Sequence, residues 1–386
     1  MRRNFAPIMP VVDIHSVGFW VVACFTLVAL CQMLVYLFLY GKLAFYKTDK
    51  VPSNTEKHPV SIIICAKNEA DNLTEFLPKF LTQDYPEYEV IVVNDCSSDN
   101  TEDVLREYVK IFPNLRSINI QEDEYYKHGK KFAIMVGIKG AKYEHLLFTD
   151  GDCYPQSEHW ISEMMQGYTA GKEIVIGYGP YRTEKSFLNK LIRFDTFAIA
   201  LQYLSLGLSN KAYMGVGRNL SYKKELFFKN KGFATHYHIT SGDDDLFINQ
   251  NANTSNTNVV ISKDSLTYSL PAKTMNEWNQ QKARHLSTSS LYTGASKNRL
   301  SMLHAGNYLF YALFIASSFQ LDWITVTASV FIVKNIIQVI VYYRVSKKLE
   351  EKELIIGYLI FEFLLLYLYP LWHIQKLFIK TRKWKG

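Results

Sequence analysis

The sequence predicts an α/β fold, with a mostly parallel sheet covered by helices, joined to helices that span a membrane. Short runs of β-branched residues, such as VSIIIC at 60–65, alternate with segments whose apolar residues recur at helical spacing. This alternation is typical of parallel sheets. Long apolar stretches lie toward both ends of the 386-residue chain and are typical of membrane helices. We therefore expect a water-facing domain carried by a membrane region.

The N-terminal membrane segment is the stretch at about 17–40, which contains no formally charged residue. As a helix it would be about 36 Å long, enough to cross the hydrocarbon core of a bilayer. No small-residue cleavage site follows Tyr40, so we interpret the stretch as a retained anchor and not as a signal peptide. The expected anchor region is 1–47, followed by a polar linker at 48–59.

The C-terminal membrane region is expected at 291–386. It contains three apolar stretches, at about 306–320, 323–343 and 354–372, before a basic tail. The first would be roughly 22 Å long as a helix, which is short of the hydrocarbon thickness. We therefore expect it to be short or re-entrant, which leaves three crossings in total and places the 344–353 loop outside.

The basic residues indicate the orientation of the soluble domain. More of them follow the anchor than precede it, which places this domain in the cytoplasm, at a bacterial-type cell membrane. The five cysteines show no metal-ligand spacing, so free thiols in a reducing compartment are expected. The net charge of +7 is modest, and no nucleic-acid partner is expected. The basic residues compared are Lys42, Lys47, Lys50 and Lys57 after the anchor, and Arg2 and Arg3 before it.

The soluble domain is expected at 60–290. An apolar helix at 186–208 is too short in its apolar part to span a membrane, so we expect it to be buried or interfacial. Ligands of parallel sheets bind at the carboxyl ends of the strands, so the residues that follow each strand are the candidates for a site. The predicted strands lie at 60–65, 89–93, 116–120 and 145–149, and the predicted helices at 73–81, 99–112 and 130–141.

Two aspartates, Asp150 and Asp152, follow the fourth predicted strand and are separated by one glycine. Carboxylates one residue apart in an extended turn can both face one cation, and hard oxygen ligands suit Mg²⁺ or Mn²⁺. A metal there would neutralise charge on a departing diphosphate. A solvated turn is the simpler alternative, because Asp and Gly favour turns in any case.

Asp95 follows the second predicted strand and begins the segment DCSSDNT. A carboxylate accepts hydrogen bonds and can take one from the N–H of uracil or a similar base. A helix-capping loop is the alternative interpretation, and the two are compatible because Asp99 is the better candidate for the cap.

Three aspartates, Asp243 to Asp245, open an apparent helix. One hypothesis is a general base that takes a proton from an acceptor hydroxyl, whereas the helix dipole alone explains at least two of these carboxylates. Gln281 and Arg284 follow later in the chain, and an arginine there can make paired contacts to phosphate oxygens. A surface helix face is the alternative for that segment.

These elements occur in an order that resembles the family 2 glycosyltransferases: a strand-end loop, DxSSD, DGD, an acidic cluster and QxxR. The resemblance covers about residues 58–290. It implies a GT-A fold, which is a Rossmann-like α/β architecture, and a sugar transfer from a nucleoside diphosphate sugar with inversion. It also implies Mg²⁺ or Mn²⁺ as cofactor.

The resemblance implies roles for the residues at the strand ends. Ala66 and Glu69 would line the nucleotide pocket, and Asp95 would hold the base. Asp150 and Asp152 would be the family's DxD pair, with Asp152 the closer metal ligand.

The acidic cluster departs from the family pattern, which usually reads Glu-Asp-x-x-Leu. Matching Leu246 to the family's leucine places the catalytic base on Asp243 and puts Gly242 where the glutamate is usual. Asp244 therefore remains a rival for the base.

The family's QxxRW element corresponds to Gln281 and Arg284, which would bind the nucleotide sugar, followed by His285. In processive polysaccharide synthases a tryptophan at this last position stacks on the acceptor sugar, so the histidine favours a short acceptor and a single transfer. Residues 215–219 are similar to a family segment near the acceptor site.

The expected function is transfer of a sugar, from a UDP-sugar as the expected donor, to an acceptor hydroxyl on a lipid-linked molecule or a glycan at the cytoplasmic membrane face. Two alternatives stay open. A processive polysaccharide synthase would be revealed by product length, and the few crossings argue against its wide channel. An inactive scaffold that binds nucleotide sugar is disfavoured because every carboxylate that the chemistry needs is present.

Overall fold

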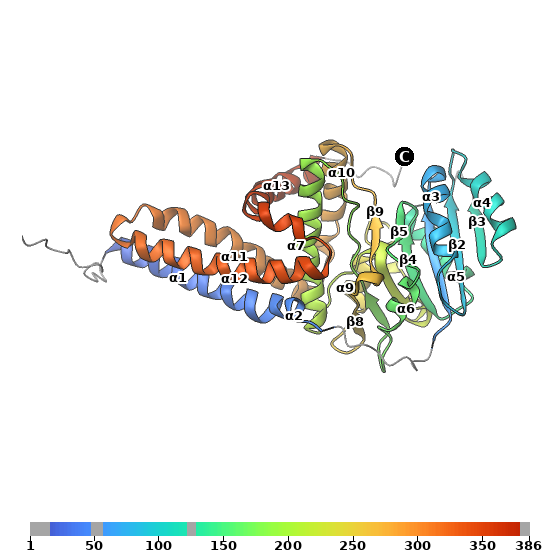
Figure 1. The fold of residues 1–386 in the computed structure, drawn as a ribbon, viewed down its shortest axis with the longest axis horizontal. Coiled ribbons are helices and arrows are strands. Elements are labelled where there is room, and N and C mark those ends of the chain that lie inside the picture. The colour runs from blue at the N-terminus through green and yellow to red at the C-terminus, as the bar shows by residue number, and fades with distance from the viewer. Residues whose placement is uncertain (1–15, 48–56, 122–128, 379–386) are drawn as a thin grey trace, which may run out of the picture.

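The computed structural model describes residues 16–47, 57–121 and 129–378, which form an α/β domain and an elongated helical part (Figure 1). The α/β domain lies at one end of the molecule, and long helices project from it toward the other end. Most of the predicted linker, and the basic tail after residue 378, lie outside the described residues. The predicted fold class is confirmed.

A seven-stranded sheet forms the centre of the α/β domain, in the order β3-β2-β1-β4-β7-β6-β8. Strands β1 to β4 run parallel to one another, whereas β7 is antiparallel to both β4 and β6. The sequence does not predict β6, β7 and β8, because strands of three or four residues carry too little periodicity. The strands are β1 (Val60–Ala66), β2 (Tyr88–Asp95), β3 (Leu115–Ile120), β4 (His145–Asp150), β6 (Ile174–Ile176), β7 (Leu220–Lys223) and β8 (Thr257–Val259), with β5 (Cys153–Pro155) and β9 (Thr267–Ser269) in a separate pair.

Helices cover both faces of the sheet, which explains why its central strands are apolar along their whole length. Successive residues of a strand point to opposite faces. Ile63 and Cys65 of β1 pack with α5, whereas Ile62 and Ile64 pack with α3, α4 and α6. The helices of the domain are α3 (Ala70–Leu81), α4 (Thr101–Ile111), α5 (Lys130–Gly140), α6 (Trp160–Met165), α8 (Lys224–Lys229), α9 (Asp245–Asn251) and α10 (Met275–Leu286).

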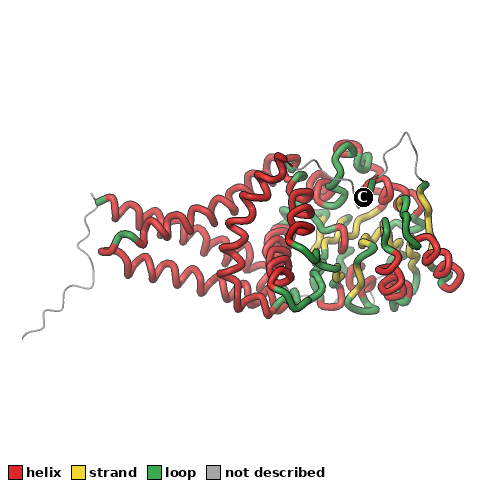
Figure 2. Tube along the Cα trace, turned by 90° about the horizontal axis from the view of Figure 1, so that it is seen from above, coloured by secondary structure: helices red, strands yellow, loops and turns green. Residues whose placement is uncertain are grey.

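Three long helices, α1, α11 and α12, lie side by side in the elongated part of the molecule (Figures 1 and 2). Their contact is aromatic: the ring centroids of Phe25 and Phe310 are 5.4 Å apart, and those of Phe314 and Phe331 are 4.0 Å apart. The helices are α1 (Val17–Leu34), α11 (Gly294–Ser318) and α12 (Ile324–Lys348), and α1 continues through a π-helical segment (Val35–Tyr40) into α2 (Gly41–Ala44).

Within the described residues, four helices are long and apolar enough to cross a membrane: Val17–Ala44, Phe187–Leu208, Leu321–Lys348 and Lys352–Gln375. The second of these, α7, is 72% buried within the protein, so the expectation of a buried helix at 186–208 is confirmed. The fourth contains α13 (Tyr358–Phe378), which packs against α7 and α10 at the base of the bundle.

The helix that contains the 306–320 stretch is longer than expected, whereas the expectation that the stretch is re-entrant stays a prediction. The helix begins at Gly294 and has 25 residues, which corresponds to about 37 Å. The sequence suggests a shorter element because residues 294–307 include many polar side chains. A helix predicted from hydropathy alone omits such a polar segment, even where the same helix continues into an apolar one.

The expectation that the 344–353 loop faces away from the soluble domain is wrong. Glu351 is buried against α7, where its Oε2 accepts a hydrogen bond of 3.0 Å from Nε of Arg193. The ammonium of Lys348 donates a hydrogen bond of 2.6 Å to the carbonyl oxygen of Tyr46, beside the end of α2. The C-terminal end of α12 therefore lies on the same side as the α/β domain.

Candidate active site

The carboxyl ends of the central strands meet at one edge of the sheet. Ala66 pairs with Asn94 across β1 and β2, and Cys65 pairs with Asp150 across β1 and β4. This register places the residues predicted from the strand ends, including the buried Asp95, along one edge, as expected for ligand sites in parallel sheets.

Hydrogen bonds hold the loops after β1 and β2 together. Asn68 adopts a left-handed conformation with φ of 54°, and its Oδ1 accepts a hydrogen bond of 2.8 Å from the backbone N–H of Ser98. Asp99 accepts bonds from the N–H groups of both Ala70 and Thr101, at 3.0 Å each. Asp99 therefore joins the two loops and bonds the N–H of the first residue of α4, but the N-cap of this helix is Asn100 and not the predicted Asp99.

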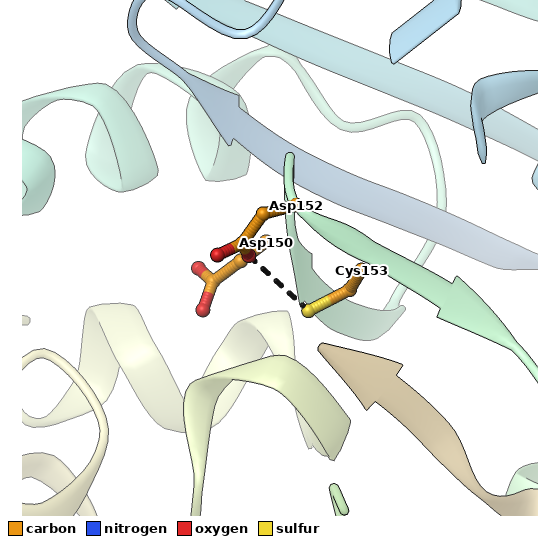
Figure 3. A group of neighbouring side chains, drawn as sticks. All are labelled: Asp150, Asp152 and Cys153. Carbon is orange, nitrogen blue, oxygen red and sulfur yellow. Dashed lines mark hydrogen bonds between the residues drawn. The ribbon is translucent and has the colours of Figure 1, made fainter. Parts of the chain in front are cut away.

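The two aspartates after β4 lie next to each other, and their carboxylates point to the same side (Figure 3). Ligand atoms of Asp150, Asp152 and Cys153 all lie within 4.8 Å of one another. The Cys153 thiol lies 3.5 Å from Oδ1 of Asp152 and donates to it, and burial raises its pKa well above the usual range. It therefore stays protonated, and the two carboxylates are the hard ligands of this group.

Lys130, the first residue of α5, lies between two of the acidic clusters. Its Nζ is 2.8 Å from Oδ1 of Asp150 and 3.2 Å from Oδ2 of Asp243. Burial disfavours the charged ammonium, but these carboxylates outweigh burial and raise the pKa of Lys130. The lysine therefore stays charged and connects the carboxyl edge of the sheet to the acidic turn before α9.

The acidic turn before α9 depends on a glycine. Gly242 has φ of 96°, and a side chain at this position would collide with Leu246, so the family's usual glutamate would be strained there. The carboxylate of Asp245 is engaged in hydrogen bonds within the protein. Its Oδ2 accepts bonds from the hydroxyl groups of Thr288 at 2.5 Å and Tyr292 at 2.7 Å. Asp245 therefore positions the turn, and Asp243 and Asp244 remain as candidates for chemistry.

The environments of these two candidates differ. For Asp243, burial acts to raise the pKa, but Lys130 outweighs burial and the pKa is lowered. For Asp244, burial and the neighbouring Asp243 raise the pKa to about 7. Oδ2 of Asp244 accepts a hydrogen bond of 2.8 Å from the N–H of Gly217. Asp243 is therefore an ion-paired carboxylate, whereas Asp244 can exchange a proton near neutral pH.

A cavity of about 230 Å³, the acidic cavity, brings most of the predicted residues together. Its wall combines negative and positive side chains from the strand ends, the acidic turn and α10. The predicted residues that line it are Glu69, Asp150, Asp152, Asp243, Asp244, Gln281 and Arg284. Ala66 and Asp95 do not line it, although they lie at the same edge of the sheet.

The positive side chains of the acidic cavity have partners that orient them. The guanidinium of Arg218 lies 4.2 Å from the ring centroid of Tyr181, and the hydroxyl of Tyr181 accepts a hydrogen bond of 3.0 Å from Nε2 of Gln281. Arg284 lies on the same wall. His285, the neighbour of Arg284 in sequence, lines the same cavity.

A second cavity of about 220 Å³, the aromatic chamber, adjoins the acidic cavity. Asp244 lines both cavities, whereas Asp243 lines only the acidic cavity of the two. Several aromatic side chains line the chamber. They come from the segment after β6, from α7 and the loop after it, from α10 and the segment after it, and from α13, and they are Tyr178, Tyr181, Tyr203, Tyr213, Trp278, Tyr292 and Tyr369.

Lys130 and Arg218 are site residues that sequence reasoning misses. The position of Lys130 is a signal in the sequence that could have identified it. A cation at the start of a helix is disfavoured by the helix dipole, and no acidic residue in the first turn of α5 offsets it. Arg218 lies in the segment 215–219 that resembles the acceptor region of the family, but only the fold brings it beside Tyr181.

The chain is similar to known glycosyltransferases in sequence and in fold. The profile of glycosyl transferase family 2 matches residues 61–231. The poly-beta-1,6-N-acetyl-D-glucosamine synthase of Staphylococcus epidermidis is 29% identical over 161 residues, which cover 41% of this chain and 37% of the synthase. The glycosyltransferase AglE of Haloferax volcanii is 36% identical over 104 residues, or 26% of this chain and 33% of AglE. The matched part thus spans little more than a third of these relatives.

Among solved structures, the mannosyltransferase PcManGT from Pyrobaculum calidifontis, in complex with GDP-Man and Mn²⁺, is similar with a TM-score of 0.56 and 17% identity. The similarity covers 89% of this chain and 98% of that one. At this identity the likeness shows the fold alone. The chain therefore shares the GT-A fold, and its residues 61–231, which include strands at the acidic cavity, are similar to glycosyl transferase family 2.

Proposed function

We propose that the protein transfers a sugar from a nucleoside diphosphate sugar to an acceptor hydroxyl, with inversion at the anomeric carbon. The observation that carries this proposal is the position of Asp244, which lines both the acidic cavity and the aromatic chamber. A donor in the first cavity and an acceptor in the second would meet at this carboxylate.

Asp244 is the proton acceptor in this proposal. The acceptor oxygen attacks the anomeric carbon, its O–H proton goes to Asp244, and the bond from that carbon to the diphosphate oxygen breaks with its electron pair on the diphosphate. The residue match through Leu246 favours Asp243 instead. We prefer Asp244 because Asp243 is paired with Lys130 at 3.2 Å, and because a base with a pKa near 7 is matched to neutral pH.

The residues after β4 fit a divalent cation, either Mg²⁺ or Mn²⁺. Burial, and then the neighbouring Asp150, raise the pKa of Asp152, so two carboxylates repel each other at a place where a cation would relieve the repulsion. Asp152 and Asp150 would hold the ion, and hard oxygen ligands suit it. When bound, the ion neutralises charge on the diphosphate.

The other positive groups have positioning roles in the proposal. Arg284 and Arg218 line the acidic cavity and would contact the diphosphate oxygens, since guanidinium groups bind such oxygens in pairs. Gln281 orients Tyr181 by its hydrogen bond. Glu69 would lie beside the nucleotide, and Asp95, with Ala66 next to it, would hold the base at the outer part of the sheet edge.

The site is proposed to face the cytoplasm, with the acceptor carried on a lipid or a glycan. Support for this side comes from the lysines that follow the anchor and from the basic C-terminal end of α12, where Lys347 and Lys348 lie on the side of the α/β domain.

The test is release of nucleoside diphosphate by the purified full-length protein. A panel of UDP- and GDP-linked sugars, with UDP-N-acetylglucosamine and GDP-mannose included, is incubated with Mn²⁺ and membrane lipids. We expect one donor to be consumed, and chelator to stop its consumption. If every donor binds but none is turned over, the protein is a scaffold. A ladder of long products would indicate a processive synthase in place of a single transfer.

A further inference from the structure

The aromatic chamber continues, through neighbouring cavities, into the membrane bundle. It shares Ile199, Gln202, His304 and Tyr369 with a connecting cavity of about 100 Å³ between α7, α11 and α13. That cavity in turn shares lining residues with a groove of about 850 Å³ between α1 and α11, the membrane groove. The shared residues of this second junction are Tyr36, Tyr40, Leu303 and Asn307.

The membrane groove has the chemistry of a site for a hydrocarbon chain. Its walls come from the two helices that lie side by side in the bundle (Figure 1). Gly306 opens the α11 wall, because an added Cβ would meet only the Gln32 side chain, at 3.8 Å. The apolar lining residues are Leu27, Val28, Leu34, Val35, Phe38, Leu39, Met302, Leu303 and Leu309.

One polar side chain in the groove lacks a partner within the described residues. Gln32 lies in the apolar helix α1, is 7% exposed, and lines the groove. Its Nε2 donates a hydrogen bond of 3.0 Å to Oδ1 of Asn307, but its Oε1 has no hydrogen-bond partner. A buried amide oxygen without a partner is costly in an apolar environment, and a hydroxyl on a bound molecule would satisfy it.

Three cations line the groove at the end nearest the α/β domain. Lys42 follows the π-helical segment of α1, Lys211 follows α7, and Arg299 lies in the second turn of α11. No described carboxylate lies within ion-pair distance of any of them. They are complementary to an anionic group held where the groove meets the domain.

From this series of cavities we propose that the acceptor is an anionic lipid that carries the sugar-accepting hydroxyl. Its hydrocarbon chain lies in the membrane groove, its phosphate-type group lies near the three cations, and its hydroxylated head group reaches Asp244 through the aromatic chamber. This inference rests on the proposed function and adds the class of acceptor. Aromatic side chains in the chamber suit the apolar faces of a sugar ring in such a head group.

The binding test does not depend on catalysis. Full-length protein in phosphatidylcholine nanodiscs is labelled with a long-chain alkyl phosphate that carries a photoactivatable diazirine in its tail, and the labelled peptides are identified by mass spectrometry. The corresponding neutral alcohol serves as the comparison probe. We expect the phosphate probe to label the 27–39 and 302–309 segments more strongly than the neutral alcohol.

Gly306→Leu and Ala305→Leu form a matched pair. Gly306 lines the groove, whereas its neighbour Ala305 is exposed and does not line it. We expect Gly306→Leu to weaken labelling by about tenfold, the factor that corresponds to about 1.4 kcal/mol of binding free energy, while Ala305→Leu leaves it within twofold of wild type. Equal labelling in the two variants would mean that lipid covers the bundle without a specific site, and would overturn the proposal.

A charge variant tests the anionic group. Arg299→Gln combined with Lys211→Gln should remove the preference for the phosphate probe over the alcohol. The control is Lys297→Gln, which changes an exposed lysine of α11 outside the groove and should keep the preference. A preference that survives the double substitution overturns the assignment of these cations. Nucleoside diphosphate release to water, measured without acceptor, reports the proposed function separately. If release occurs but labelling is unspecific, only the lipid proposal fails.

Discussion

Asp243 and Asp244 are adjacent in sequence but differ in what surrounds them. Lys130 contacts Asp243, whereas Asp244 accepts a backbone hydrogen bond and lines both cavities. The sequence predicts that the base lies in this cluster, because the aspartates begin a helix in a family-like position. The residue match through Leu246 prefers Asp243, but it takes no account of Lys130, which lies more than a hundred residues earlier in the chain.

Asp244→Asn should lower kcat by about two orders of magnitude or more, the usual scale for a general base. The amide keeps the shape of the side chain and its acceptor oxygen for the N–H of Gly217, so donor binding should change little. The matched variant is Asp243→Asn, for which we expect the smaller loss of kcat. If Asp243→Asn is the more damaging of the two while Asp244→Asn stays active, the base is Asp243.

The pH dependence follows from the raised pKa of Asp244, about 7 against an ordinary value of 3.8. The base works when deprotonated, so kcat/KM should fall about tenfold for each pH unit below 7 and level off above it. Asp243 is one of the groups that raise this pKa. In Asp243→Asn the fall of kcat/KM on the acidic side should therefore begin at a lower pH. An unchanged pH profile in that variant would contradict the influence of Asp243 on the pKa of Asp244.

At the scale of elements, the long central strands and the helices that cover them are predictable, because apolar periodicity specifies both. The acidic pair after β4 and Gln281 and Arg284 of α10 line one cavity in the structure, and their roles stay predictions. The short strands β6 to β8 are not predicted, because the pairing of strands with three or four residues is decided by tertiary contacts and not by local pattern. Sequence reasoning also misses the start of α11, because the first turns of this helix are polar.

Helix α5 packs closely on the sheet through Gly137. An added Cβ there would lie 2.7 Å from Cγ2 of Ile63, a β-branched side chain within the core. We expect Gly137→Ala to destabilise the domain. Overpacking costs about 1–3 kcal/mol, which exceeds the stabilisation of about 1 kcal/mol that the higher helix propensity of Ala provides. The control is Gly294→Ala at the start of α11, where nothing lies within 4 Å. Denaturant unfolding in detergent compares the two, and equal stabilities would show that the contact is relaxed easily.

At the scale of the whole molecule, a buried ion pair joins the membrane region to the α/β domain. Arg193 of α7 is 2% exposed and Glu351 is 1% exposed, and the hydroxyl of Tyr178 also donates to Glu351 at 3.3 Å. Arg193→Met leaves a carboxylate buried without its cation, which costs about 3–5 kcal/mol. Arg106→Met, which removes an exposed pair on α4, should cost less than about 1 kcal/mol. A thermal unfolding series on both variants decides whether the junction depends on this pair.

We expect three crossings, formed by α1, α11 and α12, because these helices lie side by side. The polar first turns of α11 explain why composition alone does not select it, and α13 is expected on the side of the α/β domain. Asp322→Cys, in the turn between α11 and α12, should react in intact cells with a reagent that does not cross membranes, while Lys352→Cys, next to Glu351, should be protected. The background for both is a variant without Cys24 and Cys31, which are exposed thiols of α1. Reaction at residue 352 with protection at 322 would reverse this topology.

The most direct test of the central claim is the anomeric configuration of the product, measured by NMR on the isolated glycoside. With an α-linked nucleotide sugar as donor, a single displacement with Asp244 as base gives the β-linked product, and Asp244→Asn forms almost none of it. An α-linked product would require a double displacement with a covalent or equivalent intermediate, and it would contradict the account.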